Sequence, residues 1–144
     1  MKRMKSIILL LSMALLSHTS FSQDNPEIKP IAPYSPAVMT ASGMLFISGQ
    51  IPIDPETGKL HKGDIQKETK IVMKRIGILL EKHGMEYRHL VKCTVFLADI
   101  NDYQAVNKVY ASFFEKNYPA REAIEVANLP LGASIEISAI VSKR

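Results

Sequence analysis

Apolar and polar side chains alternate along the last part of the chain, and this pattern predicts β-strands. One face of residues 134–142 carries apolar or small side chains: Ile135, Ile137, Ala139 and Val141. Glu136 and Ser138 point to the other face. Residues 122–126 form a second run of β type, and the Asn-Leu-Pro-Leu-Gly connection favours a turn. We therefore expect an antiparallel strand pair, with Arg121 at its mouth and across from Glu136.

Proline and glycine organise the segments before these strands. Residues 23–36 contain four prolines, which prevent helix and favour an extended approach. Residues 38–40 and 44–51 predict a hairpin in which Gly43 supplies a positive φ. Gly49 lies inside the second strand, where glycine marks a bulge or a close approach of a ligand or backbone. Its bare amide is also a candidate for anion binding.

Two segments show helical spacing. Asp64 is expected to cap a helix that runs to about His83, where the following glycine stops it. The apolar stripe of this helix consists of Ile65, Thr69, Val72, Ile76, Leu79 and Leu80. A second helix is expected to begin near Asn101, with Gln104 placed as in a capping box, and to end by Tyr118. Its predicted buried face holds Tyr103, Val106, Tyr110 and Phe113.

The order of these elements, with a further strand at residues 91–98, is β-β-α-β-α-β-β. This order predicts an α+β fold, a mixed sheet with two helices on one face. The other face also carries apolar side chains, because Phe96 and Ile140 lie opposite the rows that face the core. An uncovered apolar face favours contact with another subunit. We therefore expect a homo-oligomer with sites near its subunit seams.

The first 22 residues differ in kind from the rest. A basic start is followed by an apolar run at residues 7–16, and then by small residues that include Ser20 and Ser22. This pattern predicts a cleaved signal peptide over 1–22, a mature domain over 23–144, and a periplasmic or secreted location. The apolar run is far shorter than the roughly 20 residues that span a bilayer, so an uncleaved membrane anchor is the weaker alternative.

Composition narrows the functional classes. With 144 residues, 47% hydrophobic and 22% charged, the chain predicts one ordinary globular domain. Three of the four net positive charges come from Lys2, Arg3 and Lys5, so the remainder is close to neutral and predicts no nucleic-acid partner. The four histidines lack metal-ligand spacing, and no metal site is expected. Cys93, the single cysteine, alternates with apolar residues and is expected to be a buried, inert thiol.

Four sequence motifs occur in order: Ser-Gly-Gln-Ile-Pro, Val-Lys-Cys-Thr-Val-Phe-Leu-Ala-Asp-Ile-Asn-Asp-Tyr, Pro-Ala-Arg-Glu-Ala-Ile-Glu-Val and Ile-Glu-Ile-Ser-Ala-Ile. With them, residues 30–144 resemble the RidA family of enamine/imine deaminases. The resemblance implies a chorismate-mutase-like α+β fold and a homotrimer whose sheets face a central barrel. It also implies three clefts between subunits, and no metal or cofactor.

The resemblance assigns roles to individual residues. It implies that Arg121 binds the substrate carboxylate, that the Gly49 amide assists it, and that Glu136 orients a water molecule. Lesser pocket positions of the family match Tyr34, Ser48 and Asn107. On pattern alone, Tyr34 is equally a ring that covers a core edge. The pattern alone favours a solvated helix residue for Asn107. The cysteine that the family often carries two residues after its arginine is Ala123 here, and the implied chemistry needs no thiol.

The implied reaction is the hydrolysis of 2-imino or enamine acids to 2-oxo acids and ammonia. An arginine fork holds a carboxylate with two charge-assisted hydrogen bonds, and a glutamate moves protons between water and nitrogen. Three alternatives stay open. Arg121 and Glu136 form only an ion pair at the seam; the protein is a non-catalytic binder of small carboxylates, or of other proteins, in the envelope; or it cleaves RNA, which the near-neutral charge disfavours.

Overall fold

The computed structural model describes residues 26–143. The predicted signal peptide and its cleavage point lie outside these residues. Within the described part of the chain, no helix is both long and apolar enough to cross a bilayer.

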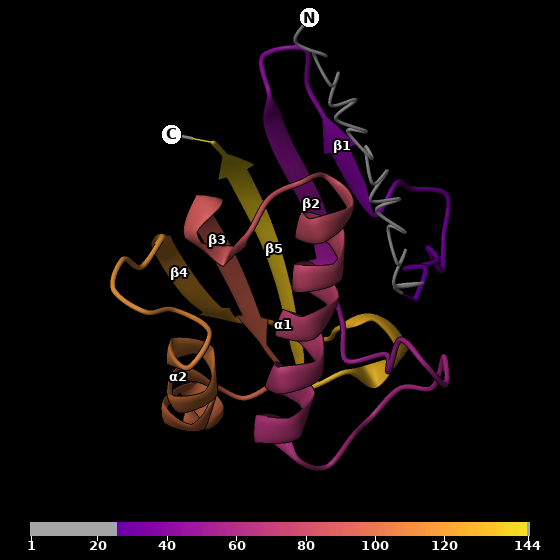
Figure 1. Ribbon diagram of the computed structural model, residues 1–144. Coiled ribbons are helices and arrows are strands. Elements are labelled where there is room, and N and C mark those ends of the chain that lie inside the picture. Colours follow the sequence, from indigo (N-terminus) through magenta and orange to yellow (C-terminus); the bar gives the residue numbers. More distant parts are fainter. Residues whose placement is uncertain (1–25, 144) are drawn as a thin grey trace, which may run out of the picture.

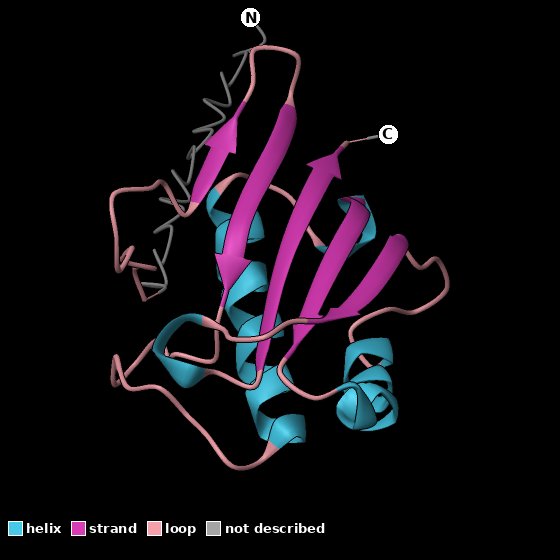
Figure 2. Ribbon diagram, turned by 180° about the vertical axis from the view of Figure 1, so that it is seen from behind, coloured by secondary structure: helices cyan, strands magenta, loops and turns pink. Residues whose placement is uncertain are grey.

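The described chain folds into a five-stranded sheet with two α-helices. The strands are β1 (Ala37–Met39), β2 (Met44–Gln50), β3 (Leu90–Leu97), β4 (Ala120–Glu125) and β5 (Ile135–Ser142). The helices are α1 (Ile65–Lys82) and α2 (Tyr103–Ala111), and short 3-10 turns lie at Tyr87–His89, Ile100–Asp102 and Pro130–Gly132. Both helices cover the same face of the sheet, and the opposite face is open (Figures 1 and 2). The predicted α+β class and element order are confirmed.

The order of the strands corrects the expected antiparallel pair. The sheet runs β1-β2-β5-β3-β4, so β3 lies between β4 and β5. Strand β4 pairs in parallel with β3, placing Arg121 beside Cys93, and β5 pairs antiparallel with β3, placing Ala139 on the other side of Cys93. Alternation shows that a segment is a strand but does not name its neighbour, and the loop at 126–134 is long enough to pass the end of β3.

Helix α1 follows its predicted boundaries. The Asp64 side chain accepts hydrogen bonds from the amides of Gln66 and Lys67, both at 3.1 Å. Gly84, with φ +64°, follows the helix in the left-handed conformation that suits its end. Its predicted stripe packs on the sheet, and four of its members are fully buried: Thr69, Val72, Ile76 and Leu80.

Helix α2 is shorter than expected. It begins at Tyr103 and ends at Ala111, well before the predicted limit at Tyr118. The capping box expected at residues 101–104 is not formed. The side chain of Asp99 instead accepts a hydrogen bond from the Asn101 amide at 2.9 Å and caps the preceding 3-10 turn. An aspartate readily bonds to a backbone amide two residues further on, and here it starts the turn earlier than the pattern indicated.

The open face of the sheet is apolar in places. Its largest apolar side chains are Val38, Phe46, Phe96, Ile124 and Ile140. Val38 is 52% exposed, Phe46 42% and Ile124 47%, whereas Phe96 and Ile140 are half-buried. Helices cover only the other face (Figure 2). A single chain therefore leaves an apolar sheet surface in water, as the alternation predicted.

Candidate functional site

Arg121 and Glu136 leave the sheet on opposite faces. Arg121 lies in register with Cys93 and Ala139, which are buried under the helices, so its side chain belongs to the helix side. Glu136 alternates with the buried Ile135 and therefore belongs to the open face. The arrangement across one strand pair that we expected is wrong, because β3 separates the two strands. Within the described residues, no ion pair joins Arg121 to Glu136.

The open face holds four of the predicted site residues in one cavity. Tyr34, Ser48, Gly49 and Glu136 line a hollow of about 270 Å³. The rest of its wall is apolar and consists of Ile31, Ala32, Ile51 and Pro130. The fold thus brings together a carboxylate, a phenol, a hydroxyl and a bare backbone amide from segments that lie far apart in the sequence.

Gly49 provides the space for the Glu136 side chain. The pairing of β2 with β5 shifts register between Ile47 and Gln50, so Gly49 lies in a bulge. A Cβ atom at Gly49 would collide with the carboxylate of Glu136. The sequence predicted a bulge, or the close approach of a ligand or another backbone, at this glycine. The bulge is confirmed, and the close neighbour in this chain is the Glu136 side chain.

Ser48 anchors the proline-rich segment that carries Tyr34. Its hydroxyl donates a hydrogen bond to the Ser35 carbonyl at 2.7 Å, and its amide donates to the Pro36 carbonyl at 3.0 Å. These two bonds hold the segment against the end of β2. Tyr34 is 41% exposed and faces the cavity, so it does not merely cover a core edge.

Glu136 holds its proton more tightly than a glutamate in water. Burial raises the pKa of its carboxyl group above the ordinary value of 4.5. Removing solvent disfavours the charged form when no opposite charge compensates for the loss. A cavity carboxylate with a raised pKa is a stronger base than a glutamate in water, which suits it to take up a proton and release it again.

A buried clamp, which the sequence did not reveal, supports the bulge from behind. Arg75 of α1 is 6% exposed and Gln50 is 2% exposed. The Arg75 Nε donates to the Gln50 Oε1 at 3.1 Å, and its Nη1 donates to the Ile53 carbonyl at 3.0 Å. The Gln50 Nε2 in turn donates to the Ser48 carbonyl at 2.9 Å. The chain is thus held on both sides of Gly49. The signal in the sequence was a charged residue next to the apolar stripe of α1.

Arg121 is held from above by helix α2. Its Nη2 donates hydrogen bonds to the Asn107 Oδ1 at 2.6 Å and to the Tyr103 hydroxyl at 3.2 Å. The guanidinium carbon lies 5.4 Å from the centre of the Tyr103 ring and 4.9 Å from that of Tyr110. Asn107 is therefore bonded to the arginine rather than only solvated. The sequence placed Tyr103 and Tyr110 on a buried face but did not assign them to the site.

Cys93 lies beneath this arginine and is fully buried. Burial raises the pKa of its thiol, which keeps it protonated and unreactive. The expected buried thiol is confirmed. In the described part of the chain, histidine, cysteine, aspartate and glutamate side chains do not gather in groups of three that would hold a metal ion.

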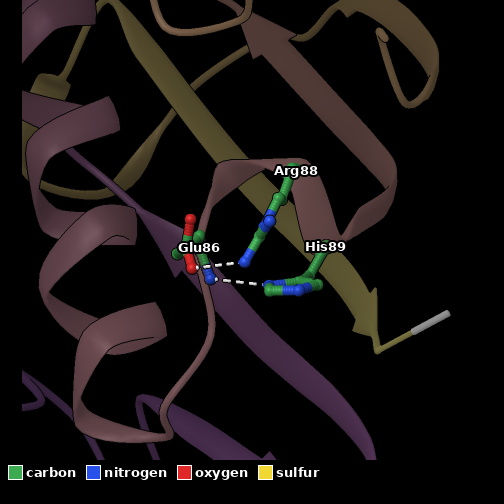
Figure 3. Close-up of polar contacts among 3 residues, drawn as sticks. All are labelled: Glu86, Arg88 and His89. Atoms are coloured by element: carbon green, nitrogen blue, oxygen red, sulfur yellow. Dashed lines mark hydrogen bonds and ion pairs between the residues drawn. The ribbon is translucent and has the colours of Figure 1, made fainter.

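A larger hollow lies elsewhere, and none of the six predicted site residues lines it. Its volume is about 520 Å³, and its walls include Tyr87, Phe113 and Phe114. The adjoining 3-10 turn is closed by an ion pair of 2.7 Å between Glu86 and Arg88. The Glu86 amide also donates to the His89 Nδ1 at 2.9 Å (Figure 3).

Known proteins resemble the whole described domain. A RutC family protein of Pyrococcus horikoshii is 47% identical over 123 residues, which cover 85% of this chain and 95% of the relative. The human 2-iminobutanoate/2-iminopropanoate deaminase is 46% identical over 110 residues, which cover 76% of this chain and 80% of the relative. The crystal structure of TdcF from E. coli with bound serine matches with a TM-score of 0.75 and 35% identity, covering 80% of this chain and 91% of that one.

Residues 24–143 match the sequence profile of the family described as Endoribonuclease L-PSP. The match spans the sheet, both helices and every residue of the two candidate groups. Together with the identity to the named deaminases, it shows that the chain belongs to this family, the RidA family.

Proposed function

We propose that the protein hydrolyses 2-imino acids and their enamine forms to 2-oxo acids and ammonia, at clefts between the subunits of a homotrimer. One observation carries the proposal. A caged guanidinium lies on one face of the sheet, and a carboxylate in a cavity, pressed against bare backbone, lies on the other. The name of the human relative supports the same reaction.

Two copies of the chain are needed to unite these groups. Within one chain the sheet separates Arg121 from Glu136, so neither group reaches a small molecule bound at the other. The exposed apolar side chains of the open face favour burial against a second copy. In the proposed trimer, each cleft takes Arg121 and Asn107 from one subunit and the cavity with Glu136 from its neighbour.

Each group has a distinct task in the reaction. Both hydrogens of the Arg121 Nη2 are used by Tyr103 and Asn107, which leaves the hydrogens of Nη1 free to bind the substrate carboxylate. The Gly49 amide assists from the bulge. The binding energy therefore holds the imine carbon near Glu136.

Glu136 then manages the protons. It accepts one from a water molecule as the water oxygen bonds to the imine carbon, and it passes this proton to the imine nitrogen, which yields a carbinolamine. It then takes the proton of the new hydroxyl group and gives it to the same nitrogen as the C–N bond breaks, and the products are a 2-oxo acid and ammonia. The reaction consumes one water molecule and needs no oxidant. Imines hydrolyse readily, so positioning and modest acid–base help suffice without a metal or cofactor.

The test uses an amino-acid oxidase to generate 2-imino acids and semicarbazide to trap those that survive. The wild-type protein should reduce trapping. Arg121→Ala should lose both turnover and affinity for a stable 2-oxo acid. Glu136→Gln should keep that affinity while turnover falls by roughly 10² to 10⁴, because the amide cannot accept a proton.

Glu122→Gln is the matched control for the Glu136 variant. Glu122 also lies on the open face, but it pairs with Lys92 at 2.9 Å and is not part of the cavity. It should leave turnover unchanged. Binding of 2-oxo acids without turnover in the wild-type protein would favour the non-catalytic binder. The absence of both binding and turnover in the wild-type protein would reject the site. Adding RNA to the same preparation tests for the endoribonuclease activity that the family's name describes.

We also propose that residues 1–22 direct export and are removed, so that the mature protein begins near Gln23 outside the cytoplasm. The basic, apolar and small-residue order of this segment supports the proposal. Intact-mass measurement on the native protein tests it. A cytosolic species that retains residue 1 would contradict it.

A further inference from the structure

The guanidinium of Arg121 is held in two different ways by helix α2. The rings of Tyr103 and Tyr110 hold its carbon over their faces, at 5.4 Å and 4.9 Å from the ring centres. Contacts of this kind restrict the position of the guanidinium but leave it free to turn in its own plane. The two hydrogen bonds at Nη2 restrict that rotation.

The two tyrosines differ at their hydroxyl groups. The Tyr103 hydroxyl is 3.2 Å from the Arg121 Nη2 and accepts a hydrogen bond from it. The Tyr110 hydroxyl lies instead beside Cys93, below the guanidinium. Two aromatic rings thus contact one cation, and only one of them also carries a hydroxyl that bonds to it.

The electrostatics of Tyr103 agree with its role as an acceptor. The hydrogen bond with Asn107, and then the charge of Arg121, lower the pKa of the Tyr103 hydroxyl below its ordinary value. A lowered pKa means that the surroundings stabilise negative charge on this oxygen. Tyr103, Asn107 and the Nη2 of Arg121 therefore form one connected group.

We propose that Tyr103 is a positioning residue for the reaction, because its hydroxyl fixes the orientation of the Arg121 guanidinium so that Nη1 faces the substrate carboxylate. This inference rests on the proposed function. Without the hydroxyl, the guanidinium pivots about its remaining bond to Asn107. A guanidinium that is not held in place loses part of its affinity for a carboxylate, because binding must then also order it.

The test compares Tyr103→Phe with Tyr110→Phe. Each change keeps the ring under the guanidinium and removes one hydroxyl. In Tyr103→Phe, KM for the 2-imino acid and Kd for 2-oxobutanoate should both rise about threefold to tenfold, the size of one lost hydrogen bond, with kcat nearly unchanged. In Tyr110→Phe, which keeps the ring contact and removes no hydrogen bond to Arg121, KM and Kd should rise less than in Tyr103→Phe.

A second comparison uses Arg121→Lys. Lysine has no planar fork whose rotation needs fixing, so adding Tyr103→Phe to this variant should raise Kd for 2-oxobutanoate no further. Equal effects of the two tyrosine changes would overturn the inference in favour of general packing of α2. If KM and Kd of Tyr103→Phe equal those of wild type, the inference is also overturned. The proposed function still stands in that case, provided that wild type turns over imino acids and Arg121→Ala does not. If wild type neither turns over imino acids nor binds 2-oxobutanoate, the proposed function fails and takes the inference with it.

Discussion

Glu136, the residue that we propose transfers protons, lies in surroundings that lower the stability of the folded chain. Its carboxyl group lies in a cavity whose remaining wall is largely apolar, and it is pressed against the bare backbone of Gly49. Burial raises its pKa, because the charged form loses solvent when the chain folds. The folded chain therefore binds this proton more tightly than the unfolded chain does.

This difference predicts how stability depends on pH. As pH rises from the unfolded pKa of about 4.5 through the higher folded pKa, the unfolded state loses its proton first, so Glu136 lowers stability across that window and above it. Glu136→Gln should therefore raise the thermal midpoint at pH 7, and the gain should vanish below about pH 4. Thermal unfolding at both pH values measures this.

For Glu122, the contribution of the charged carboxylate to stability has the opposite sign. Hydrogen bonds from Lys92 and Thr94 lower the pKa of Glu122, so its charged form favours the folded state above the unfolded pKa. The Glu122 variant should thus gain nothing at pH 7. If Glu136→Gln is less stable than wild type at pH 7, a cation of a neighbouring subunit already pairs with Glu136, and the seam ion pair becomes the better explanation of both residues.

At the scale of elements, the best predictions concern α1 and the hairpin before it. The Asp64 cap of α1, its apolar stripe and the glycine that follows the helix all act within one or two helical turns. Such signals involve neighbours in the chain and do not depend on the rest of the fold. The bulge at Gly49 was open to prediction for the same reason, since glycine inside a strand has few other uses.

The pairing of the strands did not follow from local pattern. Strands β4 and β5 are neighbours in sequence, and both alternate as strands should, yet β3 lies between them. Alternation reports which side chains share a face, and it is the same for any neighbour. Because the pairing was wrong, the relation between Arg121 and Glu136 was also wrong. The structure moves them from facing strands to opposite faces of one sheet.

At the scale of the whole molecule, the open sheet face is the surface through which we propose that a second subunit completes the site. Phe46, at 42% exposed, stands on this face, together with Val38 and Ile124. We expect light scattering to report a trimer, and Phe46→Lys to weaken it, because a charge would be buried at the interface. Ile100→Lys is the matched control, since Ile100 is 44% exposed but lies in the turn before α2. A monomer at micromolar concentration would contradict the shared cleft.

Mixed trimers test the same arrangement through activity. Arg121→Ala and Glu136→Gln subunits, unfolded, mixed in equal amounts and refolded, should recover about a quarter of wild-type activity, because one cleft of each mixed trimer then holds both intact residues. Neither variant, refolded alone, should recover this activity. No recovery in verified mixed trimers would contradict a cleft that takes Arg121 from one subunit and Glu136 from its neighbour.

The sequence by itself determined the class of fold, the boundaries of most elements, the buried Cys93 and the apolar second face of the sheet. These features depend on periodicity and on capping, which act over a few residues. Its motifs also pointed to the family and to six site residues. Four of these the structure places in one cavity, and Asn107 and Arg121 it places together on the other side.

Only the tertiary structure decided how those groups are related. It placed β3 between the last two strands, which turns Arg121 toward α2 and Glu136 toward the open face. It also joined Arg75 to Gln50 behind the bulge, and the Tyr103 hydroxyl to Arg121. Each of these contacts joins segments that are 18 or more residues apart. Such contacts form because many side chains pack at once, and no local pattern of polar and apolar residues encodes them.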